Sequence, residues 1–243
     1  MSSTIVETIM STKTGVALTA VGVVMLIRSI KRSLSPTIKL KLRCRCGKIH
    51  GEINTKVEDT LRLHCYCKDC QNYAKCIAKL GGSSNKDVLK SHGETEIIQV
   101  CKSAITINNQ DGGIEHLKLC QQKAGMPAGN KRGMFRYYAS CCNVPIMNTW
   151  DILGFVGIIE DNIDDDTRLL DKKFTIGPYS YATDEAINKP IDNVKPGLPV
   201  HRILWNLIRY LPWRHAGPFD FTAEPTMYWG SNIDENNNNK KDK

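Results

Sequence analysis

Apolar residues alternate strictly with basic ones from residue 38 to residue 46 of this chain. The alternation runs over Ile38, Lys39, Leu40, Lys41, Leu42, Arg43, Cys44, Arg45 and Cys46. A period of two predicts a β-strand with one buried side and one solvent-facing side. Both cysteines fall on the buried side at the end of the strand, and Gly47 follows where a tight turn is expected.

Later parts of the chain repeat this β-like pattern. Such runs occupy residues 61–67, 96–108, 114–120, 134–139 and 154–159. Turn signals such as Gly81-Gly82 and Asp111-Gly112-Gly113 separate several of them. We therefore expect a mainly β protein built from antiparallel strands.

Helical periodicity is strong only near the C-terminus. There the apolar residues follow helical spacing: Val200, Ile203, Leu204, Leu207, Ile208 and Leu211. Pro199 suits the first helical position and Pro212 ends the run. The pattern predicts an amphipathic helix at about 199–211.

The N-terminal part contains an uncharged segment, Gly15–Ile27, which is followed by Arg28, Lys31 and Arg32. A membrane span needs about 20 apolar residues, so this shorter segment would cross a bilayer only with strain. Positive charge after the segment would keep the rest of the chain on the cytosolic side. We predict a short hydrophobic helix that anchors the protein in a membrane, with its folded domain facing the cytosol. A mitochondrial targeting segment, or a helix packed on the core of a soluble cytoplasmic protein, are the alternatives.

These patterns divide the chain into four parts. Residues 1–36 are the anchor or targeting segment with its linker, and residues 37–180 form the main domain. Residues 181–231 are a C-terminal extension that contains the helix. The Asn/Lys/Asp-rich tail, residues 232–243, is expected to be disordered.

The net charge of the chain is confined to one segment. The 243 residues include 33 Lys+Arg and 25 Asp+Glu, and the net charge is +8. Eight bases and no acid lie between Arg28 and Lys48, so the remainder is balanced. A nucleic-acid-binding domain spreads its bases over a face of the fold, so we expect no nucleic-acid partner.

Seven of the ten cysteines lie in three tight groups, Cys44-x-Cys46, Cys65-x-Cys67-x-x-Cys70 and Cys141-Cys142. Disulfide frameworks rarely place so many cysteines this close together, and such groups are typical of thiolate ligands for zinc in a reducing compartment. We predict one or two zinc ions. Three protein ligands with an open fourth position is the layout of a catalytic zinc, which makes Cys65, Cys67 and Cys70 the candidate reactive site. Cys141 or Cys142 is expected to complete the site of Cys44 and Cys46.

The same motifs resemble a known family. C-R-C-G (44–47), C-Y-C-K-D-C-Q (65–71) and R-Y-Y-A-S-C-C-N-V-P-I (136–146) are similar to motifs of the glutathione-dependent formaldehyde-activating enzyme/centromere protein V (GFA/CENP-V) family. L-P-W-R (211–214), followed by Phe219 and Phe221, resembles a branch of that family with K-D-C-Q and C-C-N motifs. The resemblance covers roughly residues 37–225.

This resemblance implies a fold and an activity. The fold would be a β-tent of small antiparallel sheets around zinc. Cys44 and Cys46, with a late cysteine pair, would hold a structural zinc, and Cys65, Cys67 and Cys70 would hold a reactive one. The enzymatic members are carbon–sulfur lyases that condense the thiol of glutathione with formaldehyde to S-hydroxymethylglutathione. Glutathione or another small thiol is therefore the expected partner.

The chain departs from the family pattern at three positions. Ala139 stands where the late C-x-x-C-G motif has its first cysteine, Asn143 replaces its glycine, and Tyr66 replaces a histidine. Adjacent cysteines of a strand point to opposite faces, so Cys141 and Cys142 reach one ion together only from a bulge or turn. Otherwise Cys120 or Cys101 substitutes, or the site has three sulfurs and another ligand. Asn143 tolerates a positive φ better than other non-glycine residues.

Two functions follow. The first is an enzyme that uses the zinc of Cys65, Cys67 and Cys70, with an exchangeable position beside a basic groove for the carboxylates of glutathione. The second is a non-catalytic, membrane-tethered zinc module that serves as a protein-interaction domain. An open fourth position favours the enzyme, and a fourth protein thiolate would exclude it.

Overall fold

The computed structural model of the chain describes residues 22–80, 89–90, 93–109, 112–122, 134–164, 179–181, 195–196, 200–220, 223 and 225–229. Contacts between Cα atoms divide the chain into two compact units, Met1–Thr37 and Ile38–Lys243. The predicted disordered tail, residues 232–243, lies outside the described residues. The four-part division of the chain stays a prediction.

The first unit contains a helix over residues 22–34. Residues 15–21 of the predicted membrane segment lie outside the described residues. In the part of the chain that the structure describes, no helix has the length and apolar character needed to cross a membrane. The helix continues through Arg28, Lys31 and Arg32 instead of ending before them. The prediction of a membrane anchor, and with it the predicted membrane-anchored localisation, is therefore wrong.

The second unit is mainly β, as the sequence predicts. Its described strands form two sheets, and the smaller has the order β1-β2-β5, with β1 Thr37–Arg43, β2 His50–Lys56 and β5 Ile105–Ile107. The larger has the order β11-β10-β3-β4-β9-β8-β7-β6-β12. Its strands are β3 Leu61–Cys65, β4 Thr95–Cys101, β6 Leu117–Gln122, β7 Phe135–Ala139, β8 Val144–Thr149, β9 Phe155–Ile159, β10 Tyr179–Tyr181, β11 Lys195–Pro196 and β12 Met227–Trp229. The central pairs are antiparallel, whereas β10 and β12 pair in parallel at the edges.

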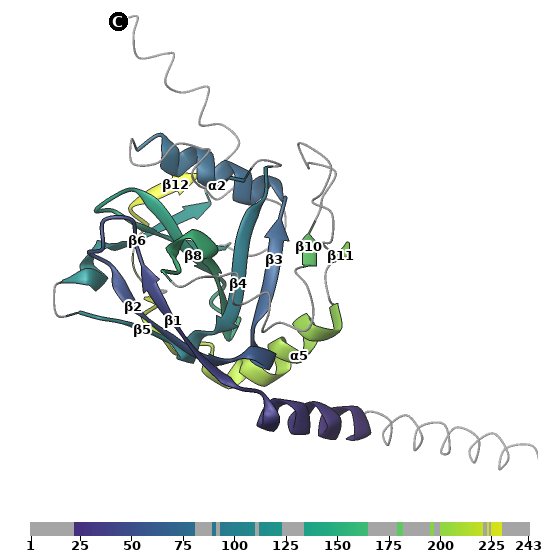
Figure 1. The fold of residues 1–243 in the computed structure, drawn as a ribbon. Coiled ribbons are helices and arrows are strands. Elements are labelled where there is room, and N and C mark those ends of the chain that lie inside the picture. Colours follow the sequence, from purple (N-terminus) through teal and green to yellow (C-terminus); the bar gives the residue numbers. More distant parts are fainter. Residues whose placement is uncertain are drawn as a thin grey trace, which may run out of the picture. The chain divides into compact units, whose positions relative to one another are not determined.

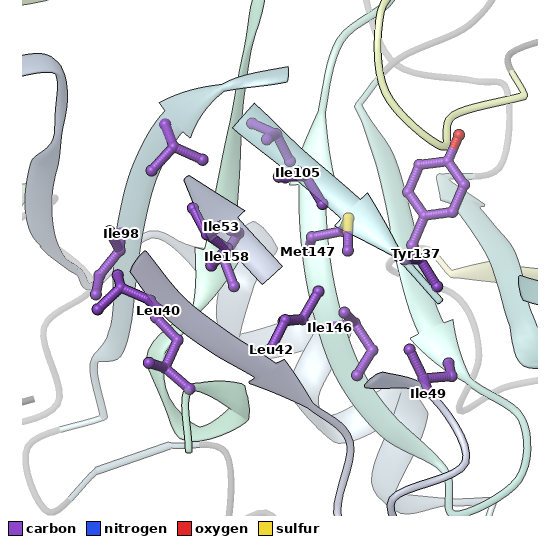
Figure 2. Packing of buried hydrophobic residues seen from close by; sticks show 14 of the residues in the cluster. Leu40, Leu42, Ile49, Ile53, Ile98, Ile105, Tyr137, Ile146, Met147 and Ile158 are labelled. Carbon is purple, nitrogen blue, oxygen red and sulfur yellow. The ribbon is translucent and has the colours of Figure 1, made fainter. Parts of the chain in front are cut away.

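The main core lies between the two sheets. In β1, Ile38, Leu40 and Leu42 are buried while the bases between them are exposed, which confirms the alternation that predicted this strand. Ile98, Ile158, Tyr137 and other residues of the large sheet pack in the same buried cluster (Figure 2). Burial of apolar side chains is the dominant stabilising term, so this cluster fixes the two sheets against each other.

Two helices, α2 Lys68–Ala78 and α5 Val200–Tyr210, are drawn in Figure 1. Their side chains pack on the opposite face of the large sheet. Tyr73 and Ile77 of α2 pack on Cys120 and Tyr138. Ile203 of α5 packs on a cluster that includes Leu63, Ile97 and Cys65. Helix α5 coincides with the helix predicted at about 199–211, but its proposed first residue, Pro199, lies outside the described residues. Short 3₁₀ turns connect several elements: η1 Val57–Asp59, η2 Lys102–Ala104, η3 Gly113–His116, η4 Glu160–Asn162 and η5 Leu211–Trp213.

Gly154, just before β9, permits the close approach of α5. A Cβ atom at this position would overlap the carbonyl oxygen and carbon of Tyr210, the last residue of that helix. We expect Gly154→Ala to lower the free energy of unfolding by about 1–3 kcal/mol, because the helix end must shift to make room. Urea denaturation of the full-length chain measures this change.

Gly22→Ala is the matched control, since a Cβ atom at Gly22 meets no atom within 4 Å. We expect this variant to unfold at the same urea concentration as the parent protein or slightly above it. Equal destabilisation by the two substitutions would contradict the packing described for Gly154.

Candidate metal centres

Four cysteines converge from two distant parts of the chain, and we call Cys44, Cys46, Cys141 and Cys142 cluster 1. Their Sγ atoms all lie within 4.8 Å of one another. The Cys44–Cys46, Cys44–Cys141 and Cys46–Cys141 separations are 3.7, 3.8 and 3.3 Å, and the Cys141–Cys142 separation is 4.0 Å. Each of the four is a free thiol. Cluster 1 could therefore hold a metal ion.

The first half of cluster 1 comes from the turn that follows β1. The strand ends at Arg43, and the Gly47 N–H donates to the carbonyl oxygen of Cys44 at 2.9 Å. Gly47 has φ +82°, a conformation that favours glycine, as the sequence predicts. The alternation suggested that Cys46 would lie on the buried side of the strand, whereas it is an exposed residue of the turn. The turn rather than the strand brings Cys46 to Cys44.

The second half of cluster 1 comes from the turn between β7 and β8. Residues 140–143 form this turn, and Asn143 has φ +50°. A turn lets Cys141 and Cys142 point in the same direction, which a strand would forbid. Both therefore reach the cluster, and neither Cys120 nor Cys101 substitutes. Ala139 is the last residue of β7 and is fully buried in the core.

Cluster 1 already favours one thiolate without a metal. Burial alone would raise the pKa of Cys46, but the backbone N–H of Lys48 and the neighbouring thiols stabilise its thiolate and lower the pKa to about 7. Burial, which outweighs a hydrogen bond from the backbone of Cys46, raises the pKa of Cys142 to about 11. The main-chain N–H of Ile49 also donates to Cys44 Sγ at 3.2 Å. Such hydrogen bonds to sulfur support a thiolate that serves as a metal ligand.

Cys65, Cys67 and Cys70 form a second group, cluster 2. Cys65 ends β3, Cys67 caps the N-terminus of α2, and Cys70 lies in the first turn of that helix. The Cys65–Cys67 and Cys65–Cys70 Sγ separations are 3.2 and 3.5 Å. Cys67 Sγ also accepts a hydrogen bond from the backbone N–H of Cys70 at 3.4 Å. Among the described residues, no fourth cysteine, histidine or carboxylate joins this group.

A buried arginine contacts cluster 2 at Cys70. Arg136, on β7, is 1% exposed, and its Nη1 donates to Cys70 Sγ at 3.7 Å. Its guanidinium also lies over the ring of Tyr73, 5.0 Å from the centroid. Sequence reasoning assigned Arg136 no role. The available signal was a base between two aromatic residues, Phe135 and Tyr137, in a β-like run.

This arginine changes the acidity of cluster 2. Hydrogen bonding with Cys65 and Cys67, together with the charge of Arg136, holds the pKa of Cys70 well below its ordinary value although the residue is buried. Hydrogen bonding with Cys67 and Cys70, together with burial, raises the pKa of Cys65. Cluster 2 without metal therefore favours one thiolate, at Cys70, paired with Arg136.

A cavity of about 260 Å³ adjoins cluster 2, and all three cysteines contribute to its wall. The rest of the wall is mostly apolar and includes Ile97, Trp150 and other side chains. No lysine, arginine or carboxylate is among the described residues that line it. The predicted basic groove for glutathione carboxylates is therefore not found at this cavity.

The three remaining cysteines lie outside both clusters. Cys76, on α2, and Cys120, on β6, belong to one buried cluster. Cys101 is buried, and its Sγ lies 3.1 Å from Ser103 Oγ. All seven cysteines selected from the sequence thus fall into the two groups that could hold a metal ion, and the other three do not.

Comparison with known proteins identifies a family. Residues 37–193 match the model of a family of unknown function, DUF6151. This match spans more than half of the chain, and the chain therefore belongs to that family. No curated protein matches the sequence. The resemblance to the GFA/CENP-V family stays a prediction.

Proposed function

We propose that this DUF6151 protein binds two zinc ions and that the second of them activates a small thiol for addition to formaldehyde or a related carbonyl. Cluster 1 is the structural site of this proposal and cluster 2 is the reactive one. The proposal rests on the composition of cluster 2. Its three cysteines adjoin a cavity, and no fourth protein ligand is found among the described residues. Three protein ligands and an open position are typical of catalytic zinc.

Zinc is the metal that the donor atoms favour. Four sulfur ligands placed tetrahedrally 2.3 Å from a zinc ion lie about 3.8 Å apart. The four Sγ–Sγ separations given above for cluster 1 range from 3.3 to 4.0 Å, so small shifts of the side chains suffice. Clusters made only of thiolates select soft or borderline metals, and tetrahedral sulfur sites are typical of zinc or iron–sulfur centres. The resemblance to the GFA/CENP-V family, whose fold is a β-tent around zinc, favours zinc between these two.

The residues around cluster 2 fit a reactive role. Zinc in such a site acts as a Lewis acid and favours the thiolate form of a thiol bound to it. Arg136 balances the net negative charge that three thiolates and one divalent ion leave in a buried position. Ile97, Phe155 and other buried apolar residues of the cavity wall would limit the access of bulk water to the reacting groups.

The proposed reaction is balanced without a redox partner. The thiolate sulfur attacks the carbonyl carbon of formaldehyde, the C–S bond forms, and the π electrons of the C=O bond pass to oxygen. The oxygen then takes up the proton that the thiol released. The product is a hydroxymethyl thioether with all atoms of the thiol and the aldehyde retained.

A non-catalytic zinc module that binds a protein partner is the second candidate. The outer side of α5 favours it, because Leu204 and Ile208 are more than half exposed there. Trp213, in the turn after the helix, is also 51% exposed. Apolar side chains gathered on a surface are typical of interaction sites. Cluster 2 would then have only a structural role.

A condensation assay on the full-length, zinc-loaded protein separates the two candidates. Formaldehyde consumption is followed with a panel of thiols that includes glutathione and N-acetylcysteamine. We expect thiol-dependent acceleration by the parent protein and a loss of about 100-fold or more in Cys67→Ser, because serine is a poor ligand for zinc and the reactive ion is lost.

Cys101→Ser is the control, since Cys101 is a buried cysteine outside both clusters. It should keep the activity of the parent protein. Absence of acceleration with every thiol, in protein shown to contain two zinc ions, would exclude the enzyme and favour the interaction module.

A further inference from the structure

The cavity beside cluster 2 is unlike a site for a charged thiol. Its volume is about 260 Å³, and its described wall combines the three cysteines with apolar side chains from β3, β4, β9 and α5. A carboxylate or ammonium group placed there would lose its hydration without gaining a partner of opposite charge. Glutathione carries two carboxylates and one ammonium group, so the part of a ligand that enters this cavity must be uncharged.

Three residues in a row across the sheet form one side of the cavity. Gly157 on β9 lies opposite Gln99 on β4 and opposite Asn148 on β8. Residues directly opposite one another in neighbouring strands point to the same face, so the amides of Gln99 and Asn148 flank the glycine. All three line the cavity.

The glycine keeps the space between the two amides open. A Cβ atom at Gly157 would lie 2.7 Å from Ile97 Cγ2 and 2.9 Å from Asn148 Oδ1. Both distances are shorter than a van der Waals contact, so any larger residue would displace the walls of the cavity.

Each amide has an atom without a hydrogen-bond partner. Among the described residues, Gln99 Oε1 and Asn148 Nδ2 are shielded from solvent and make no hydrogen bond. An unmade hydrogen bond on a buried polar atom is unfavourable, and the last torsion of an amide side chain turns readily. Asn148 Oδ1 is the atom of that amide nearest Gly157, and a half-turn of the last torsion would bring Nδ2 there instead. Gln99 Oε1 as acceptor and Asn148 Nδ2 as donor would then match the N–H and C=O groups of a secondary amide.

We infer that the cavity binds an uncharged small thiol that carries a secondary amide, with its sulfur toward cluster 2 and its amide between Gln99 and Asn148. The ligand N–H donates to Gln99 Oε1, and the ligand C=O accepts from Asn148 Nδ2. This inference rests on the proposed function, because the zinc of cluster 2 holds the sulfur. It adds the chemical class of the thiol, which differs from glutathione.

Calorimetric titration of the full-length, zinc-loaded protein tests the inference. The probes are N-acetylcysteamine, butanethiol, which has a chain of similar length without the amide, and glutathione. Two hydrogen bonds to the amide predict that N-acetylcysteamine binds about 10-fold more tightly than butanethiol. Glutathione is expected to bind more weakly than N-acetylcysteamine.

Two variants remove the polar partners with little change in volume. Gln99→Met and Asn148→Leu should each lower the preference for N-acetylcysteamine over butanethiol several-fold, while Cys101→Ser should leave it unchanged. Two results would overturn this inference but not the proposed function. One is tighter binding of glutathione than of N-acetylcysteamine, and the other is an unchanged preference for N-acetylcysteamine over butanethiol in both variants.

The zinc content of the same samples separates this failure from failure of the proposed function. If the protein contains zinc in cluster 2 but binds N-acetylcysteamine no more tightly than butanethiol, only the inferred class of thiol is wrong. Parent protein that binds no zinc in cluster 2 overturns the proposed function and this inference together.

Discussion

Replacing Cys44 by serine is expected to remove most of the stability of the folded domain. Cys44 is 1% exposed and packs in the core between the two sheets. A metal in cluster 1 would link the turn after β1 to the turn between β7 and β8, segments that are 97 residues apart at Cys44 and Cys141. Because a structural metal site is absent from the unfolded chain, its binding free energy is folding free energy. A 1,000-fold loss of zinc affinity corresponds to about 4 kcal/mol, a large fraction of the stability of an ordinary domain.

Urea denaturation measures this effect on the full-length chain, with and without a strong chelator. The parent protein with chelator should resemble Cys44→Ser without chelator, and chelator should change the variant little. Cys101→Ser is the matched control, because it also places a serine at a buried cysteine but leaves both clusters intact. Equal stability of Cys44→Ser and Cys101→Ser in zinc-containing buffer would contradict a metal in cluster 1.

Replacing Arg136 by methionine is expected to weaken both the fold and the metal affinity of cluster 2. Arg136 is fully buried, and its guanidinium contacts Cys70 Sγ and the ring of Tyr73. Methionine keeps an unbranched side chain but removes the positive charge. A buried negative charge then remains without compensation, which destabilises a protein by about 3–5 kcal/mol. Loss of a hydrogen bond to a metal ligand lowers metal affinity by about 10- to 100-fold.

Competition with a chelator of known affinity measures the second effect, and urea denaturation measures the first. Arg209→Met is the matched control, since Arg209 bridges Asp59 at 2.6 Å instead of contacting a cysteine. This control should lose some stability but keep the parent affinity for zinc. Unchanged zinc affinity in Arg136→Met would show that the arginine supports only the packing of β7 and α2.

The strands were predictable where one face of the sheet is apolar and the other is exposed to solvent. β1 is the clearest case, because its bases are exposed and its aliphatic residues are buried. β2 and β8 were missed for two reasons. β2, His50–Lys56, is mostly polar, and β8 contains Pro145, which seldom occurs inside a strand. Pro145 lies beside the irregular pairing between β7 and β8 at Tyr137 and Tyr138.

Helix α2 was also missed, because its buried side contains few strong apolar residues. Cys70, Tyr73, Ala74 and Ile77 form much of that side. Its N-cap is Cys67, a residue outside the Ser/Thr/Asp/Asn group that marks helix starts in a sequence. The cysteine that looked only like a metal ligand therefore also begins the helix.

The cysteine groups were predictable because ligand spacing is a local property of the chain. Their surroundings were not, since they depend on long-range pairing. The turn that aligns Cys141 with Cys142, the charge of Arg136 behind Cys70, and the open space over Gly157 all require neighbouring strands in register. The predicted membrane anchor was wrong because an uncharged run does not show where the helix that contains it ends.

Native mass spectrometry of the full-length protein, purified with zinc, tests the central claim most directly. We predict two zinc ions per chain in the parent protein and one in Cys67→Ser, which leaves cluster 1 intact. Cys101→Ser should retain two. A parent protein that carries no zinc, or the same zinc content in the parent protein and Cys67→Ser, would contradict the assignment of a structural site and a second, open site.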